Sequence, residues 1–206
     1  MTLPRGALPI ASSKTVPLVL ASESPRRKAM LAQAGIVPDA ILAASIDETI
    51  HKNETPRKYS RRLAEAKVRT IVERWTGAPS VILAADTVVA CGRRILPKAE
   101  SDADVRECLK LLSGRNHMVL TAVAVSAANG RLRTRIVETR VSLQRLTDEE
   151  VESYVHCSEG LGKAGGYAIQ GRAETFVRRL SGSYSNVVGL PLRETVTLLR
   201  ASGYSC

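Results

Sequence analysis

A short segment near the start of the chain has the features of a phosphate-binding turn. Ser22-Glu-Ser-Pro-Arg-Arg-Lys28 follows an apolar run, and its Ser24-Pro25 pair is typical of the first positions of a helix. The first N–H groups of a helix have no partner within it, so such an end binds anions. The three cations that follow oppose the helix dipole unless an anion lies between them and the helix end. The segment therefore predicts a phosphate site, with a solvated basic turn as the alternative.

A second candidate is an aspartate inside an apolar run. Asp86 follows Val81–Ala85 and precedes Thr87-Val-Val89. A carboxylate there is costly to bury unless it contacts a cation, a metal or several donors, and perturbed carboxylates mark functional sites. The alternative is an aspartate that caps a neighbouring loop. Asp47-Glu48 is a further acidic pair that could share a divalent cation with Asp86, because carboxylates suit magnesium and manganese. Taken alone, such a pair is more often a loop or helix-cap feature.

Two lysines stand out by their positions. Lys67 lies four residues after Leu63 on a predicted helix, near the stripe that should be buried. Lys98 follows the predicted hairpin that starts with Asp86. Either lysine could reach a phosphate, and a solvated surface position is the alternative for each.

Other motifs carry less chemistry. Gly160-x-Gly162-x-x-Gly165 matches the dinucleotide-binding string, but no helix is predicted after it and no acid lies about 20 residues further on. We expect these glycines to shape a turn beside Lys163 and Tyr167. The four cysteines include no C-x-x-C pair and no nearby histidine cluster, which argues against structural zinc and a disulfide framework and favours a reducing compartment.

The framework that positions these residues is predicted from hydrophobic patterning and capping signals. Strands and helices alternate, and Asn129-Gly130 marks a hairpin, so we expect an α/β fold with a mixed sheet. Residues 1–17 lack a signal peptide's apolar stretch and are expected to form a flexible arm, with residues 18–206 as a single domain. The predicted strands are 18–22, 81–90, 93–96, 117–125, 132–143 and 167–170, and the predicted helices are 25–34, 56–75, 102–112, 148–157 and 191–202.

Composition narrows the class of partner. The chain has 206 residues and a formal charge of +10, and 22 of its 30 basic residues are arginine, whose guanidinium groups match phosphate oxygens. A solvated basic surface explains that excess equally well. Only 3% of residues are aromatic, which disfavours recognition of bases by stacking. The longest apolar runs fall far short of a membrane span, so we expect no membrane partner.

Several motifs together resemble a known family. The stretch Leu20-Ala-Ser-Glu-Ser-Pro-Arg-Arg27, followed by Met30-Leu31 and Gly35, is similar to the opening motif of the Maf (septum-formation) nucleotide pyrophosphatases. The resemblance spans roughly residues 18–200. Further segments match in the family's order: Asp47-Glu48, Arg62–Lys67, Ala85–Val89, Leu112–His117, Lys163–Gly171 and Asn186–Pro191.

The resemblance implies an activity and a fold. Members hydrolyse nucleoside triphosphates to the monophosphate and pyrophosphate with a divalent metal, here magnesium or manganese. They are cytoplasmic, often homodimeric, and linked to division arrest and to the removal of noncanonical nucleotides. Their fold, similar to that of inosine triphosphate pyrophosphatases, is a mixed sheet flanked by helices, with two lobes around a cleft.

The resemblance also implies catalytic and metal-binding roles. Asp86 corresponds to the family's proton acceptor, and Lys67 and Lys98 correspond to lysines of the cleft. Glu48 and Asp86 correspond to the acids near the metal. The implied chemistry is attack of water on the α-phosphorus, assisted by Asp86 and the metal. The arginines, the lysines and the metal then take up the developing negative charge.

Five positions are implied to bind the substrate. Ser24, Arg26 and Arg27 correspond to the triphosphate-binding turn, and Arg27, Thr87 and Gln170 to positions tied to base selection. Members that prefer dTTP and UTP carry the Arg-Arg pair and the threonine found here, whereas members that prefer 7-methyl-GTP differ at both places. The resemblance therefore points to pyrimidine triphosphates, with 7-methyl-GTP or broad specificity as the alternative.

Two segments depart from the family pattern. Leu96-Pro-Lys98-Ala stands where the family usually has Gly-Lys-Pro, which leaves the position of Lys98 open, and Arg172–Thr175 replaces a common run of small residues. The alternative from another class is a basic nucleic-acid-binding protein or a division regulator without catalysis. We expect no stable nucleic-acid complex, since such a protein does not need Asp86 inside an apolar strand.

Overall fold

The computed structural model describes residues 16–206. The predicted N-terminal arm lies outside the described residues except for Val16 and Pro17. The carbonyl of Pro17 accepts a hydrogen bond from the backbone N–H of Val81. Within residues 16–206, no helix combines the length and the apolar character needed to cross a membrane.

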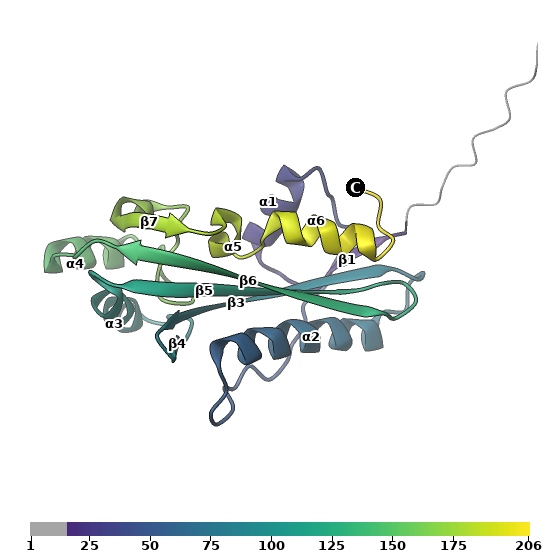
Figure 1. Cartoon of the computed structure of the whole chain (residues 1–206), viewed down its shortest axis with the longest axis horizontal. Helices are drawn as coiled ribbons and strands as arrows, with labels where there is room; N and C mark the ends of the chain where they lie inside the picture. Colours follow the sequence, from purple (N-terminus) through teal and green to yellow (C-terminus); the bar gives the residue numbers. More distant parts are fainter. Residues whose placement is uncertain (1–15) are drawn as a thin grey trace, which may run out of the picture.

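A twisted, mixed sheet of seven strands forms the centre of the protein (Figure 1). The strands follow the order β2-β1-β3-β5-β6-β7, and β4 pairs with one end of β3. The pairs β2–β1 and β1–β3 are parallel, and the others are antiparallel. The strands are β1 (Leu18–Leu20), β2 (Ala40–Ile41), β3 (Val81–Cys91), β4 (Arg94–Leu96), β5 (Asn116–Ser126), β6 (Leu132–Leu143) and β7 (Val177–Ser181).

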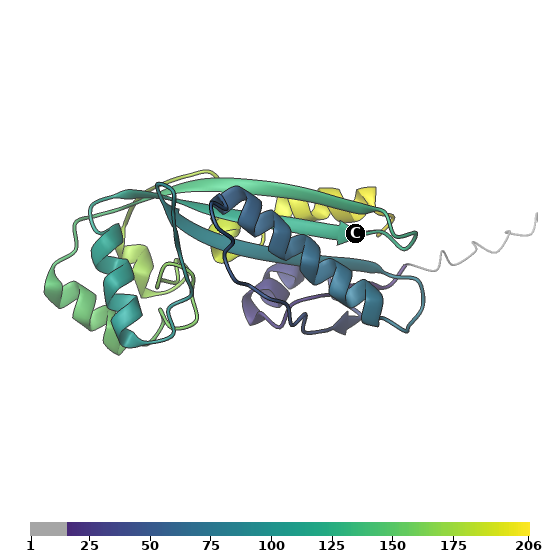
Figure 2. The same ribbon diagram turned by 90° about the horizontal axis from the view of Figure 1, so that it is seen from below.

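Helices cover the sheet and divide the molecule into two lobes. In the first lobe, α1 and α6 lie on one face of the sheet and α2 lies along the other (Figures 1 and 2). In the second lobe, α3 and α4 pack together at the far end of the long strands (Figure 2). The helices are α1 (Pro25–Gln33), α2 (Pro56–Arg74), α3 (Asp102–Leu112), α4 (Asp148–His156), α5 (Tyr184–Val188) and α6 (Leu192–Ala201), with a 3₁₀ turn at Arg172–Phe176.

The hydrophobic core consists of three apolar clusters, which are divided between the two lobes. One fills the second lobe around Leu109, Val141 and Tyr154. The other two lie on opposite faces of the sheet in the first lobe, around Leu31 beneath α1 and α6, and around Val68 beneath α2. The predicted α/β fold, with a mixed sheet flanked by helices and two lobes, is confirmed.

An open edge in the middle of β3 defines the site. β1 pairs with residues 81–83, β4 pairs with residues 89–91, and β5 pairs with residues 82–90 along the opposite edge. The segment 84–88 therefore has no strand partner on one side. Asp86 and Thr87 lie in this segment, where the two lobes meet.

Most sequence-predicted elements are confirmed, but the strand predicted at 167–170 is wrong. That stretch follows tight turns in which Gly162, Gly165 and Gly166 all have positive φ, so the predicted glycine turn is confirmed. A Cβ on Gly165 would lie 2.8 Å from a side-chain carbon of Val89, which explains why a larger residue does not fit. The pattern gave no signal for β2, β7 or α5, which are each five residues or shorter.

Three of the helix starts differ in how they are capped. Ser101 with Asp104 and Thr147 with Glu150 form capping boxes at α3 and α4. Ser24 occupies the cap position of α1, but its side chain makes no capping hydrogen bond. The Ser24 hydroxyl is therefore not committed to its own helix.

Candidate active site

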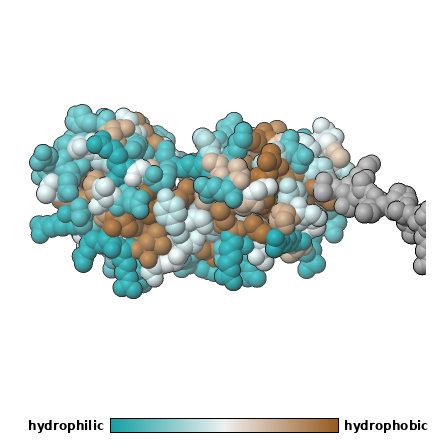
Figure 3. Space-filling view, turned by 90° about the horizontal axis from the view of Figure 1, so that it is seen from above, coloured by the Kyte–Doolittle hydropathy of each residue, from teal (hydrophilic) through white to brown (hydrophobic). Residues whose placement is uncertain are grey.

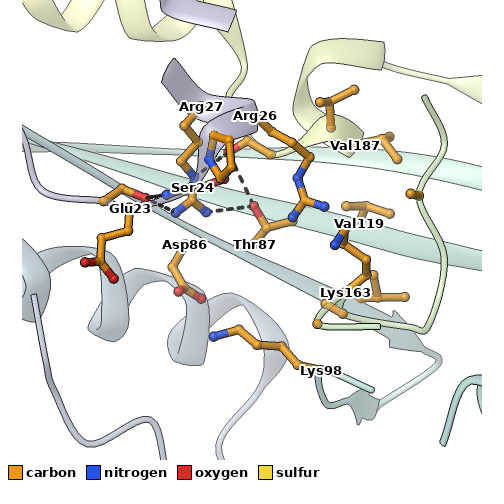
Figure 4. A pocket seen from close by; sticks show the side chains of 18 of the residues that line it. Glu23, Ser24, Arg26, Arg27, Asp86, Thr87, Lys98, Val119, Lys163 and Val187 are labelled. Carbon is orange, nitrogen blue, oxygen red and sulfur yellow. Dashed lines mark hydrogen bonds between the residues drawn. The ribbon is translucent and has the colours of Figure 1, made fainter. Parts of the chain in front are cut away.

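A cleft of about 560 Å³ lies between the two lobes. Its first wall is the turn between β1 and α1, and its second wall is the loop 162–170 of the other lobe. The open edge of β3 forms its floor (Figure 4). All the predicted site residues line this cleft: Ser24, Arg26, Arg27, Glu48, Lys67, Asp86, Thr87, Lys98 and Gln170.

Two carboxylates and two lysines form a chain across the cleft. Lys67 Nζ lies 2.6 Å from Asp86 Oδ1 and 2.8 Å from Glu48 Oε1, so it bridges the two acids. Lys98 Nζ donates to the other oxygen of Glu48 at 2.7 Å. Asp86 and Lys67 are buried, with 5% and 9% of their surface exposed, whereas Lys98 is exposed. The departure at Leu96–Ala99 therefore still delivers Lys98 to the cleft.

The two carboxylates have opposite electrostatic environments. Burial raises the pKa of Asp86, and the charges of Lys67 and Arg27 only partly oppose this. Burial also raises the pKa of Glu48, but hydrogen bonds from Lys67 and Lys98 outweigh it and hold that pKa at about 2. Asp86 is thus the more basic carboxylate and Glu48 stays ionised, a division typical of acid–base sites.

Contacts from α2 hold Glu48 in the cleft. The Tyr59 hydroxyl donates to the backbone carbonyl of Glu48 at 2.7 Å, and Arg62 donates to the carbonyl of Thr49 at 2.8 Å. Asp47 does not line the cleft, and its carboxylate accepts the backbone N–H of Thr49 in an exposed turn. Only one member of the predicted acidic pair therefore reaches the site.

Neighbouring arginines on α1 have different environments. Arg27 donates to the hydroxyl of Ser22 at 3.1 Å, to the hydroxyl of Thr87 at 3.3 Å and to the carbonyl of Gly189 at 3.0 Å (Figure 4). These bonds tie α1 to β3 and to the segment after α5. In contrast, Arg26 has a buried Nε with no partner among the described residues. Arg26 is the arginine available to a ligand.

A polar chain inside the sheet fixes Thr87. The hydroxyls of Thr87 and Thr121 lie 2.9 Å apart, and the Thr121 hydroxyl donates to the carbonyl of Asn186 at 3.0 Å. The Asn186 amide in turn donates to the carbonyl of Val119 and the hydroxyl of Thr139. This network explains why Asn186 is fully buried, and it holds Thr87 in place at the edge of β3.

Lys163 is a candidate binding residue that sequence reasoning missed. It lies in the second wall of the cleft, and its side chain reaches the same space as that of Arg26 (Figure 4). Burial and the charge of Arg26 both lower the pKa of Lys163. Two cations from opposite walls thus face a common space, an arrangement suited to a polyanion. Lys163 begins the Lys163–Gly171 motif, and that position was the one sequence signal that could have identified it.

Ser24 and Gln170 complete the walls. Ser24 lies at the start of α1, a helix end that lines the cleft and has no acid in its first turn. Gln170 is exposed at the far wall. The cleft therefore offers anion donors at one end and an amide at the other.

The residues present suit a magnesium-type ion that is held mostly by its substrate. Glu48 and Asp86 both contact the single positive charge of Lys67, so they enclose a space that favours a cation. Within residues 16–206, no cluster of three or more histidine, cysteine, aspartate or glutamate side chains could hold a metal. Mg²⁺ commonly takes one or two carboxylates together with substrate phosphates, and that ligand set fits Glu48 and Asp86.

Sequence similarity to known proteins identifies the family. The sequence model described as "Maf-like protein" matches residues 17–202. The chain belongs to the Maf family. A relative from Caulobacter vibrioides, named dTTP/UTP pyrophosphatase, is 57% identical over 187 residues, which cover 91% of this chain and 96% of the relative. A Brucella abortus relative of the same name is 55% identical over 191 residues, covering 91% and 92%.

Solved structures give a weaker similarity. A HAM1 protein from Coxiella burnetii aligns with 90% of this Maf-family chain and 99% of its own, at 15% identity and a TM-score of 0.47. A score at that level neither supports nor opposes the expected likeness to inosine triphosphate pyrophosphatases.

Proposed function

We propose that this Maf-family chain is a nucleoside triphosphate pyrophosphatase, which releases pyrophosphate and leaves a nucleoside monophosphate. The observation that carries the proposal is the Asp86–Lys67–Glu48 chain at the open edge of β3, in which Asp86 and Lys67 are buried. Two cations from opposite walls, Arg26 and Lys163, lie in the same cleft, and neither forms a salt bridge within residues 16–206. A general base and a polyphosphate-binding surface thus occur together, as in-line hydrolysis at phosphorus requires.

The proposed roles follow from the charge state of each group. Asp86, whose pKa is raised by burial, accepts a proton from the attacking water. Lys67 keeps Asp86 oriented through its 2.6 Å hydrogen bond. Arg26, Lys163 and the start of α1 bind the phosphates and stabilise the charge that develops on the leaving pyrophosphate. Lys98 acts through Glu48, which it holds in the ionised state.

The proposal includes a divalent cation, magnesium or manganese, held by Glu48 and Asp86 together with the substrate phosphates. When bound, the ion would neutralise phosphate charge and polarise the phosphorus. Lys67 bridges the two acids, so metal binding and the position of Lys67 should be coupled.

For the base, we propose uracil and thymine. The relatives from Caulobacter vibrioides and Brucella abortus are both named for dTTP and UTP. No aromatic side chain other than Tyr167 lines the cleft, so base recognition must rely on polar groups. Gln170 is exposed at the far wall, and Thr87 is held in the fixed Arg27–Thr87–Thr121 network.

A nucleotide panel tests this function. The purified chain is assayed with dTTP, UTP, 7-methyl-GTP, dCTP and dATP, each with Mg²⁺, with Mn²⁺ and with chelator, and both products are quantified. We expect equal amounts of monophosphate and pyrophosphate from dTTP and UTP, and none with chelator. Release of single phosphate would overturn the reaction type, and preference for 7-methyl-GTP would overturn the proposed base.

The family resemblance alone supports a cytoplasmic homodimer that acts in nucleotide-pool cleaning or division arrest. Light scattering of the full chain tests the dimer, and a monomer at micromolar concentration would exclude it. Fractionation of cells that express the chain tests the location.

A further inference from the structure

A second hollow lies at the far end of the sheet, in the lobe that carries α3 and α4. Its volume is also about 560 Å³, and it shares no lining residue with the catalytic cleft. We call it the β6–β7 hollow. Hydrophilic residues dominate the surface at this end of the molecule (Figure 3). Its lining is Gly114, Asn116, Arg140, Ser142, Leu143, Arg178, Arg179 and Ser181, which includes three arginines and no acid.

Strand register places four of these side chains, Arg140, Ser142, Arg179 and Ser181, on one face. Ser142 stands opposite Arg179 on β7, and Arg140 stands opposite Ser181, so arginine and serine alternate across the ladder. The intervening Val141 is buried and faces the core. The hollow is therefore a regular array of hydrogen-bond donors on the outer face of the sheet.

The amide of Asn116 adds to this array. Ser142 donates its hydroxyl proton to Asn116 Oδ1, so the amide oxygen of Asn116 is already used. The N–H₂ group of Asn116 has no hydrogen bond to a described residue and remains free to donate. The hollow thus gains a further donor from β5.

The three arginines have no counter-charge among residues 16–206. None of them forms a salt bridge or a side-chain hydrogen bond with a described residue. Glu138, two residues before Arg140 on the same strand face, is bonded to Arg57. Three like charges around one hollow repel one another, and a bound anion relieves that repulsion. Two other exposed arginines, Arg131 just before β6 and Arg135 on β6, do not line this hollow.

We propose that the β6–β7 hollow is a second anion site that binds an oligophosphate, separate from the proposed catalytic function. The hollow has the size of a small-molecule site, and its three guanidinium groups suit an anion of two or more phosphates. No aromatic side chain lines it, so it lacks the stacking surface of a single-stranded nucleic-acid site. The oligophosphate is either free, as inorganic pyrophosphate is, or the tail of a nucleotide.

Calorimetric titration with inorganic pyrophosphate tests the site. The wild-type chain should bind two equivalents, one in the cleft and one in the hollow. Arg140→Ser/Arg179→Ser should weaken the second by tenfold or more and leave the first unchanged. The cleft variant Arg26→Ser/Lys163→Met should show the reverse. A charge-matched control, Arg131→Ser/Arg135→Ser, should keep both equivalents.

Several outcomes separate the alternatives. One equivalent in the wild type that the Arg140→Ser/Arg179→Ser variant retains, or an equal loss in the control, overturns the proposal. Binding of an oligonucleotide through Arg140 and Arg179 without binding of pyrophosphate also overturns it. A non-hydrolysable α,β-methylene UTP analogue that displaces pyrophosphate from the hollow of the Arg26→Ser/Lys163→Met variant identifies a nucleotide tail, and failure to displace identifies free oligophosphate. Circular dichroism of each variant checks folding.

Discussion

Replacement of Lys67 by methionine should destabilise the protein far more than the same change at Lys98. Both lysines bond the same glutamate at nearly equal distances, 2.8 Å for Lys67 and 2.7 Å for Lys98. They differ in burial, because 11% of the Lys67 side chain is exposed against 56% for Lys98. Only Lys67 also bonds the buried Asp86. The pair is therefore a matched comparison of a buried and an exposed salt bridge.

The magnitudes follow from that difference. Removing one partner of a buried ion pair costs about 3–5 kcal/mol, because the remaining charge stays buried and unpaired. An exposed pair contributes about 0–1 kcal/mol. For a domain of this size, the Lys67→Met variant should melt lower by on the order of 10 °C, and the Lys98→Met variant by about 4 °C or less.

Urea unfolding, followed by circular dichroism and by the fluorescence of Trp75, measures both changes. A double variant, Lys67→Met/Asp86→Asn, removes both charges and should recover much of the lost stability, since no unpaired charge remains. Equal destabilisation by Lys67→Met and Lys98→Met would refute the reasoning. So would a double variant less stable than Lys67→Met alone.

Three further predictions concern binding, pH and capping. Lys163→Met should raise KM for the triphosphate about tenfold, as expected for a lost charge-assisted hydrogen bond. Lys28 is exposed, and Lys28→Met should leave KM unchanged. Unchanged steady-state kinetics for Lys163→Met would exclude Lys163 from substrate binding. Burial lowers the pKa of His117 to about 4, so the unfolded chain binds the extra proton first and stability should fall by about 3 kcal/mol from pH 6.5 to 4. His117→Gln should reduce this dependence of the unfolding free energy on pH, measured by urea titration at each pH. An unaltered pH dependence would contradict the assignment to His117. Thr147→Ala should cost about 1 kcal/mol, whereas Ser24→Ala, which loses no cap bond, should leave the free energy of unfolding nearly unchanged; similar losses would refute the capping assignment.

Local chemistry made parts of the site predictable from the sequence. Cations at a helix start singled out the turn at Ser22–Arg27, an acid inside an apolar run singled out Asp86, and both line the cleft. The prediction that Lys67 lies near the buried stripe of its helix is confirmed. Each of these predictions uses only residues that are close together in the sequence.

Other features depend on topology and could not be predicted. The open edge of β3 exists because β1 and β4 pair with different ends of the same strand, a consequence of register over the whole sheet. Lys163 faces Arg26 only because the two lobes meet there. Arg27 looks identical to Arg26 in the sequence, yet its donors are taken by Ser22, Thr87 and Gly189.

The most direct test of the account compares Asp86→Asn with Asp47→Asn. Asp86 lies buried on the open edge of β3, whereas Asp47 lies one residue from Glu48 in an exposed turn outside the cleft. Pyrophosphate release from dTTP and the calorimetric Kd of the non-hydrolysable UTP analogue are measured for each. Asp86→Asn should lower turnover by about 10²–10⁴, as expected for a lost general base, and keep Kd within about threefold. Asp47→Asn should keep both values, and unchanged pyrophosphate release by Asp86→Asn would contradict the account.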